Sequence, residues 1–267
     1  MIKTNLHTHS TFSDGVNTLQ EIAQAAMEKG FASLGFSDHS YTPFDPHYCE
    51  GMKDPGKYFE EVSSLKKSLE GRFSIFMGLE LDYFSEIDCK GITDYIIGSV
   101  HYIEKDGVYY QLDYSAERTA LAINNACGGS SDKYAEEYYN NVCLNIEKNN
   151  PDVLGHLDLI TKFGTVDETT SAYRKAALGA ADFAVERGLI IEINTNAVYR
   201  KLKSNPYPHE FILKHIFEKG GRVTVNSDSH IAESLDFYFD ECAELLKSIG
   251  FKSTWNLTKD GFKEFEI

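Results

Sequence analysis

Residues 4–10 read Thr-Asn-Leu-His-Thr-His-Ser, a short strand-like run that passes directly into two histidines one residue apart. In an extended segment the side chains at positions i and i+2 lie on the same face, so His7 and His9 can reach the same ligand. The same pattern recurs along the chain: a short apolar or β-prone run ends in residues able to bind a metal ion. This repetition decides the predicted fold.

Six further runs of this kind follow the first predicted strand, residues 4–7. They cover residues 33–37, 73–79, 95–100, 153–155, 189–193 and 222–225. Helical patterns occupy residues 19–29, 58–70, 133–148, 170–187, 209–219 and 234–249, with glycine at positions 30, 71, 188, 220 and 250, where helices are expected to stop. Strands that alternate with helices predict an α/β fold of parallel βαβ units.

A closed barrel fits this pattern better than a dinucleotide-binding sheet, because no GxGxxG motif follows the first strand. Two stretches, residues 40–56 and 104–132, have no regular pattern, and we expect both to be irregular and to cover the mouth of the barrel. No repeat or linker divides the chain, so residues 1–267 are predicted to form a single domain.

Residues that can bind metal follow nearly every predicted strand. They are His7, His9 and Asp14; Asp38 and His39; Glu80; His101; His156 and Asp158; Glu192 and Asn194; Asp228 and His230. In a parallel barrel all these strand ends lie at one face, where such folds place their active sites. Buried ionisable groups are costly unless they are paired or metal-bound. The set therefore predicts a multinuclear metal site, whereas His47, His209 and His215 fit no strand end and are expected at the surface or on helices.

The composition limits the partners. With 26 Lys and Arg against 41 Asp and Glu, the formal charge is −15, which opposes nucleic-acid binding and favours a small substrate. No apolar run approaches the roughly 18 residues needed to span a bilayer, and no secretion signal is expected. Five cysteines without CxxC spacing are typical of reduced thiols in a cytoplasmic protein. The oligomeric state stays open.

Five motifs together resemble those of the polymerase-and-histidinol-phosphatase (PHP) superfamily. They are His7-Thr8-His9-Ser10 with Asp14-Gly15, Ser37-Asp38-His39-Ser40, Gly98-Ser99-Val100-His101, Gly155-His156-Leu157-Asp158 and Ser227-Asp228-Ser229-His230. The resemblance runs from end to end. Within the superfamily, Ile97–His101 and Glu192-Ile193-Asn194-Thr195-Asn196 followed by Arg200-Lys201 are similar to the stand-alone histidinol-phosphate phosphatases.

The resemblance implies a distorted (β/α)7 TIM-like barrel of the PHP type that holds three divalent ions. One ion would be bound by His7, His9, Glu80 and Asp228, a second by Glu80, His101 and His156, and a third by Asp14, His39 and His230. All nine positions carry residue types that the family uses. Mixed imidazole and carboxylate ligands suit zinc, iron or manganese, and the sequence does not choose among them.

The resemblance also implies a phosphatase, with L-histidinol phosphate as its substrate in histidine biosynthesis. A hydroxide bridging the first two ions would attack phosphorus in line with the leaving alkoxide. Catalytic roles fall to Asp228, His230 and Arg200, and substrate binding to Arg200 and Lys162; relatives often have Arg in place of Lys162. A metal-bound water or Asp228 is expected to protonate the leaving group.

Three alternatives stay open. The chain could be a PHP-type phosphoesterase that acts on nucleotides or another small phosphate ester. A nuclease or proofreading role fits less well, because the surface is acidic and no second domain is expected. A non-enzymatic regulatory or metal-storage barrel would predict loss of a ligand at one of the motifs, and none is lost.

Overall fold

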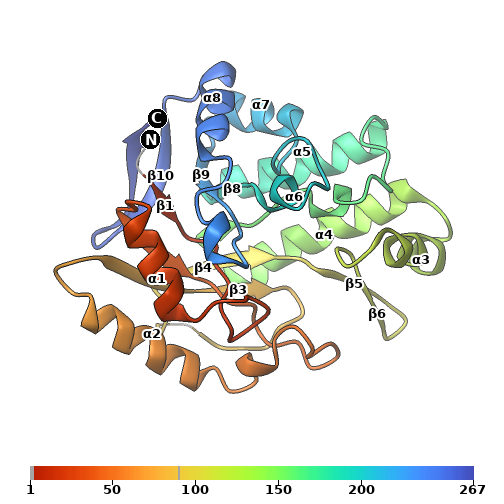
Figure 1. The fold of residues 1–267 in the computed structure, drawn as a ribbon. Coiled ribbons are helices and arrows are strands. Elements are labelled where there is room, and N and C mark those ends of the chain that lie inside the picture. Colours follow the sequence, from red (N-terminus) through yellow and green to blue (C-terminus); the bar gives the residue numbers. More distant parts are fainter. Residues whose placement is uncertain (1–2, 90) are drawn as a thin grey trace.

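The computed structural model describes residues 3–89 and 91–267 and contains a seven-stranded parallel sheet in the order β1-β2-β3-β4-β7-β8-β9. The ends of this sheet meet beyond β1 and β9, where the His9 amide donates to Ser229 O (2.8 Å) and the Ser229 amide to His7 O (3.1 Å). These bonds complete a barrel (Figure 1), as predicted. The strands are β1 Thr4–Asn5, β2 Ser33–Phe36, β3 Ser74–Asp82, β4 Tyr95–Ser99, β7 Val153–Leu154, β8 Ile190–Asn194 and β9 Arg222–Asn226.

Helices pack around the outside of the barrel (Figure 1). The first has a capping box: the Thr18 side chain accepts the Glu21 amide, and the Glu21 carboxylate accepts the Thr18 amide. Its buried positions, such as Leu19, Ile22 and Ala26, follow helical spacing and face the sheet. The helices are α1 Leu19–Glu28, α2 Gly56–Ser68, α3 Ala116–Cys127, α4 Ser131–Asn149, α5 Ser171–Glu186, α6 Asn196–Tyr199, α7 Glu210–Glu218 and α8 Phe239–Ile249.

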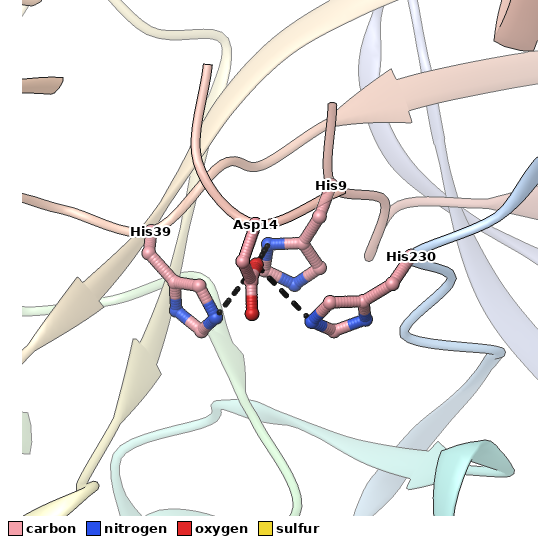
Figure 2. A group of neighbouring side chains, drawn as sticks. All are labelled: His9, Asp14, His39 and His230. Carbon is pink, nitrogen blue, oxygen red and sulfur yellow. Dashed lines mark ion pairs between the residues drawn. The ribbon is translucent and has the colours of Figure 1, made fainter. Parts of the chain in front are cut away.

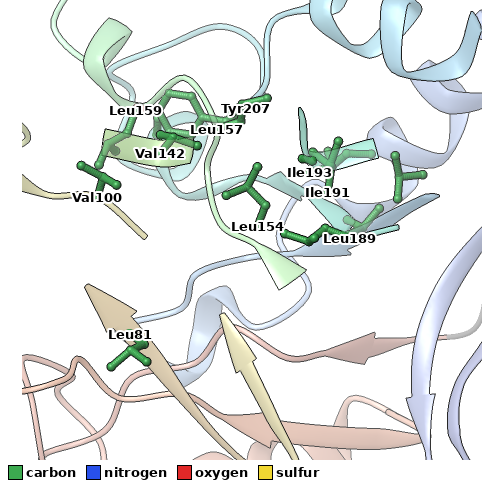
Figure 3. Packing of buried hydrophobic residues seen from close by; sticks show 14 of the residues in the cluster. Leu81, Val100, Val142, Leu154, Leu157, Leu159, Leu189, Ile191, Ile193 and Tyr207 are labelled. Atoms are coloured by element: carbon green, nitrogen blue, oxygen red, sulfur yellow. The ribbon is translucent and has the colours of Figure 1, made fainter. Parts of the chain in front are cut away.

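Alternation along each strand separates two layers of side chains. On β3, Ile75, Met77, Leu79 and Leu81 belong to the core between the sheet and the helices. Figure 3 shows part of this core, with Leu81, Leu154, Ile191 and Ile193. The opposite face of β3, which points into the barrel, carries Phe76, Gly78 and Glu80. The acid Glu80 therefore lies on the same face as the apolar Phe76, four residues further along the strand.

A C-terminal hairpin, which the sequence patterns did not predict, covers the N-terminal ends of the barrel strands. It consists of β10 Ser253–Thr258 and β11 Gly261–Glu266. Leu257 of β10 joins Leu6, Phe76, Tyr95, Ile97, Val153 and Ile190 in a separate apolar cluster. Thr4 at the start of β1 donates to Asn256 (2.5 Å). The hairpin therefore closes the end of the barrel opposite the predicted site.

The stretch 104–132, predicted to be irregular, is largely ordered, so that expectation was wrong. It contains most of a hairpin, β5 Tyr102–Lys105 and β6 Val108–Gln111, and the whole of α3. Ser115 caps α3 by accepting the Arg118 amide, and Gly128 ends it with φ 62°. The stretch 40–56 is irregular as predicted, apart from the short 3₁₀ turn Glu50–Met52.

The predicted helix over residues 234–249 also starts later than expected, at Phe239. A 3₁₀ turn occupies Ala232–Ser234, and Tyr238 has φ 66°, a left-handed conformation that a helix cannot continue through. The five glycines expected to end helices all have positive φ. Over the described residues, no helix combines the length and the apolar character needed to cross a membrane.

Candidate active site

The carboxylate of Glu80 lies at the centre of the barrel mouth. Glu80 is 1% exposed, and five imidazoles from four segments of the chain surround it. Its backbone pairs with the extension of β2, because the Ser40 amide donates to Glu80 O and the Glu80 amide to Asp38 O. The contacts are 2.9, 3.3 and 3.4 Å from Oε1 to Nε2 of His156, His101 and His7, and 2.7 and 3.6 Å from Oε2 to His39 Nδ1 and His9 Nε2.

Asp228 is the second carboxylate of this group. Its Oδ1 lies 3.1 Å from His9 Nε2 and 3.6 Å from His7 Nε2. Asp228 has φ 49°, a conformation that costs a non-glycine residue about 1–3 kcal/mol. Two amides hold it there: Asn194 donates to Asp228 Oδ2 (3.1 Å) and Asn196 to Asp228 O (2.6 Å).

A third group surrounds Asp14, which is more accessible than the other two acids (Figure 2). Asp14 Oδ1 lies 3.3 Å from His230 Nε2, 3.5 Å from His39 Nε2 and 3.9 Å from His9 Nδ1. The loop that carries Asp14 is fixed by Asp38, whose carboxylate accepts hydrogen bonds from Ser10 and Ser13. Asp38 therefore has a structural role beside the site.

All nine predicted ligands come together at this mouth, and their donor atoms fit divalent metal ions. They fall into four overlapping groups whose ligand atoms lie within 4.8 Å of one another. His7 Nε2 and Glu80 Oε2 are buried, yet neither forms a hydrogen bond of good geometry with the described residues. A cation would satisfy both atoms, which are otherwise costly to bury. The groups are His9, Asp14, His39 and His230; His7, Glu80 and His156; His7, His9 and Asp228; and His39, Glu80 and His101.

The charged groups of the site shift one another's pKa values. Burial opposes protonation of His230, but the nearby Asp14 carboxylate outweighs it and raises the pKa of His230 to about 9. Burial and the neighbouring His230 and His39 lower the pKa of His9 to about 3. Burial also opposes ionisation of Glu80, but the surrounding imidazoles hold its pKa well below the usual range. Divalent cations would compete with these protons for the same nitrogen atoms.

The two predicted basic residues lie in different environments. Lys162 is 6% exposed and its Nζ lies 3.1 Å from Asp113 Oδ2. Arg200 follows α6, is exposed, and forms no ion pair with the described residues. A third basic residue, Lys203, was not predicted: it lies 3.6 Å from Glu168 and donates to Thr161, next to Lys162.

A backbone hydrogen bond links the segment that carries Asp113 to one of the candidate metal ligands. The Leu112 amide donates to His101 O (2.9 Å), so Asp113 follows a residue bonded to one of the candidate ligands. Burial opposes the charge of Asp113, but the Lys162 ammonium and then His101 outweigh it and lower the pKa of Asp113. A carboxylate and an ammonium are thus placed together at the rim of the site.

Residues 40–56 meet the β5–β6 hairpin beside the site. Phe44 stacks on Tyr109 with ring centroids 3.7 Å apart, and Tyr102 donates to Asp45 (2.9 Å). Tyr48 contacts His39 edge to face at 4.9 Å. These contacts join residues 40–56 to the β5–β6 hairpin and to a candidate ligand.

The histidines set aside as structural lie elsewhere. His47 is exposed, His209 is the N-cap of α7, and His215 lies in α7, 2.8 Å from Asp182. Asp158 accepts the His209 amide (2.8 Å), so this strand-end acid supports the start of α7.

Two acids outside the nine candidate ligands have direct contacts with them; the sequence placed Glu192 only in the larger set of strand-end residues able to bind metal and did not single out Asp82. Glu192 on β8 lies beside His7, and Asp82 on β3 lies beside His101. Strand alternation gives a signal for Asp82, because it is two residues from Glu80 and shares its face.

The fold and these groups define a parallel α/β barrel with a histidine- and carboxylate-rich metal site at its mouth. The model of the PHP domain matches residues 5–196, and the chain belongs to this family.

Relatives and solved structures agree with this assignment. The chain is 28% identical to the histidinol-phosphatase of Bacillus subtilis, over 91% of this chain and 99% of that protein. Among solved structures, a histidinol phosphatase candidate from Listeria monocytogenes superposes with a TM-score of 0.79 at 21% identity, over 90% and 99% of the two chains. The histidinol phosphate phosphatase of Lactococcus lactis, complexed with zinc, L-histidinol and phosphate, gives 0.74 at 21% identity, over 98% and 99%.

Proposed function

We propose that this chain is a metal-dependent phosphatase that hydrolyses L-histidinol phosphate to L-histidinol and phosphate in histidine biosynthesis. The observation that carries the proposal is the gathering of all nine candidate ligands at one barrel mouth. The match to the Bacillus subtilis histidinol-phosphatase over 99% of its length supports the choice of substrate.

Three divalent ions would be held by the nine ligands in the grouping that the family resemblance implies. Zinc, iron and manganese all suit these donors, and zinc in the Lactococcus lactis complex makes it the first ion to test. Such ions would supply positive charge for the phosphate and acidify the water that attacks it.

The chain's own residues would bind and orient the ester. Lys162 is the cation best placed to contact the phosphate oxygens, since it is buried at the rim with its ammonium 3.1 Å from Asp113. Arg200, free of ion pairs with the described residues, is a second candidate for the phosphate. Asp113 would face the ammonium group of histidinol, so that the neighbouring phosphate and ammonium of the substrate each meet a rim residue of opposite charge.

Proton transfer to the leaving alkoxide falls to Asp228 and His230. His230 Nδ1 lies 3.5 Å from Asp228 Oδ1 and 3.0 Å from Asp228 O. A proton held between these two residues is within reach of the site that Asp228 shares with His7 and His9.

We also propose that the enzyme acts in the cytoplasm on a small molecule and not on nucleic acid. The five cysteines are free thiols, as expected for a reducing compartment. The formal charge of −15 supports a small substrate over a polyanion.

The test is kcat/KM of zinc-reconstituted protein for L-histidinol phosphate beside a nucleoside monophosphate, a sugar phosphate and p-nitrophenyl phosphate. A preference of about 10² or more, roughly 2.7 kcal/mol of differential transition-state binding, is expected. Even, weak turnover of the whole panel would replace histidinol phosphate with a broader substrate class. Absence of turnover by fully metallated protein would refute the phosphatase itself.

A further inference from the structure

Two buried carboxylates outside the nine candidate ligands lie behind two of the imidazoles. Glu192 Oε1 is 2.7 Å from His7 Nδ1, and Asp82 Oδ2 is 3.2 Å from His101 Nδ1. In both rings the opposite nitrogen faces Glu80: Nε2 of His7 is 3.4 Å and Nε2 of His101 is 3.3 Å from Glu80 Oε1. The two histidines therefore have the same arrangement, with a carboxylate on one side and the metal-binding group on the other.

The position of Glu192 is fixed from three strands. Its Oε2 accepts the His156 amide and the Asn194 side chain, both at 2.9 Å. Its Oε1 accepts the Asn226 side chain at 2.9 Å in addition to His7. Glu192 is fully buried and every one of these contacts brings it a donor. Since an ionised carboxylate only accepts, the proton of His7 belongs on Nδ1 and the lone pair on Nε2.

Asp82 is fixed in the same way beside His101. Its Oδ2 accepts the His101 amide (2.9 Å) as well as the ring nitrogen, and its Oδ1 accepts the Phe84 amide (2.7 Å). The Asp82 amide donates to Ser40 (2.9 Å). These bonds leave Asp82 little freedom to turn away from His101.

His156 and His9 differ from these two histidines. His156 Nδ1 is buried without a hydrogen-bond partner among the described residues, although Nε2 lies 2.9 Å from Glu80. His9 Nδ1 has Ser13 Oγ at 3.5 Å and no carboxylate nearer than Asp14 at 3.9 Å. His39 and His230 also have a carboxylate near each ring nitrogen, but those carboxylates are themselves candidate ligands. Among the described residues, carboxylates outside the nine are thus paired with His7 and His101, which the implied grouping assigns to different ions.

We propose that Glu192 and Asp82 are positioning residues for the metal centre, Glu192 for the ion held by His7 and Asp82 for the ion held by His101. Each keeps its imidazole in the Nδ1-protonated form and aims Nε2 at its own ion. Partners of this kind commonly change metal affinity by about 10- to 100-fold. The inference rests on the metal centre of the proposed function, but metal affinity is measured without substrate, so the two can fail separately.

The experiment measures zinc binding to chelator-stripped protein by competition with a chromophoric chelator. Glu192→Gln and Asp82→Asn should each weaken one of three zinc equivalents by about 10- to 100-fold. The double variant should weaken two equivalents and leave the third, at Asp14, His39 and His230, unchanged. Weakening of the same single equivalent by both variants, equal weakening of all three, or no weakening would overturn the proposal.

Asp94→Asn is the matched control. Asp94 Oδ2 accepts the Met77 amide of β3 (2.8 Å) and pairs with Lys66, but it touches no imidazole. This variant removes a similar structural bond from the same strand and should leave all three zinc affinities unchanged.

A measurement on the unaltered protein covers the case in which Glu192→Gln does not fold. In zinc-loaded protein, ¹⁵N–¹H correlations of the imidazoles should show the proton on Nδ1 for both His7 and His101. A proton on Nε2 of either ring would overturn the role of the carboxylate behind it.

Discussion

Replacing Gly78 with alanine should destabilise the barrel, because the new methyl group would enter the space of Tyr95. A Cβ at position 78 overlaps the Tyr95 ring most closely at Cζ, and even Cε2, the third-nearest atom, is 2.6 Å away. Tyr95 is fully buried on β4, and its hydroxyl, which has one proton to donate, lies within hydrogen-bond distance of the carbonyl oxygens of Leu6 and Phe36. The ring therefore joins three strands directly beneath the metal-binding groups.

The magnitude follows from two effects. Carbon atoms in contact lie about 3.5–4.0 Å apart, so the ring must move by about 1 Å in a closely packed interior, which costs roughly 1–3 kcal/mol. Moving the hydroxyl away from the two buried carbonyls adds about 1–3 kcal/mol. We expect Gly78→Ala to lower the free energy of unfolding by about 2–6 kcal/mol.

The assay is urea unfolding of metal-free protein, which separates packing from metal binding. Gly179→Ala is the control: Gly179 lies exposed in α5 with nothing within 4 Å of its added Cβ, and alanine should stabilise it by up to about 1 kcal/mol. A loss below about 1 kcal/mol for Gly78→Ala would refute the packing argument.

A double-mutant cycle sharpens the test. The Cβ added at Gly35 meets the phenol oxygen of Tyr95, whereas the one at Gly78 meets ring carbons. Tyr95→Phe should therefore recover part of the cost of Gly35→Ala and little of the cost of Gly78→Ala, with a coupling of about 0.5–3 kcal/mol. Equal recovery at both positions would place the clash elsewhere.

Three further outcomes are expected. Removing the metal with a chelator should abolish phosphate release and lower Tm. Adding zinc at about 1,000 times its Kd should restore roughly 4 kcal/mol to the free energy of unfolding. An unchanged Tm would contradict a metal site in the folded chain. Asp113→Asn should lower kcat/KM for L-histidinol phosphate about tenfold. The kcat/KM for p-nitrophenyl phosphate, which has no ammonium group, should change by less than about twofold. Equal losses for both substrates would mean that Asp113 acts only by holding Lys162 in place. Burial opposes the charge of Asp236, but Lys29 and Lys3 outweigh it and lower its pKa, so its contribution is present above the unfolded pKa of about 3.9 and lost as pH falls through the folded value. Asp236→Asn should therefore lower Tm at pH 7, with a loss of less than about 1 kcal/mol in the free energy of unfolding for these partly exposed pairs. The difference from the parent should shrink as pH falls below about 3.9 towards the folded pKa, and a difference that stays constant over this range would exclude the ion pairs as its cause.

Most of the barrel could be predicted from sequence because local patterns indicate both the inner face of each strand and the direction in which the strands pair. On β3 the alternation of Phe76, Gly78 and Glu80 places the acid on the inner face, and the order of strand and helix implies parallel pairing. Even the two-residue strand β7 was found, since Val153–Leu154 stands directly before a histidine motif. Strand alternation and the order of strands and helices depend only on residues close together in the sequence, so both can be recognised before the structure is known.

The missed elements depend on distant contacts. The β10–β11 hairpin is exposed along β11 and becomes stable by burying Leu257 among residues from β1, β3 and β4. By contrast, the serine cap and the terminal glycine of α3 are both visible in the sequence. The wrong expectation for residues 104–132 arose because a long connection was assumed to be irregular.

The site divides in the same way. Residue types at strand ends indicated a larger set of metal-binding candidates, from which the family resemblance selected nine, but the partners of their second nitrogen atoms could not be predicted. Glu192 reaches His7 only because β8 and the start of the chain converge across 185 residues. Lys203 likewise approaches Thr161 through a loop whose path no local pattern describes.

The most direct test of the metal centre is anomalous diffraction from zinc-loaded crystals of this chain, recorded at the zinc absorption edge. Three peaks are expected, each about 2.0–2.3 Å from ligand atoms among the nine residues from His7 to His230. A single peak, or peaks bound by residues outside this set, would contradict the trinuclear site on which the proposed function depends.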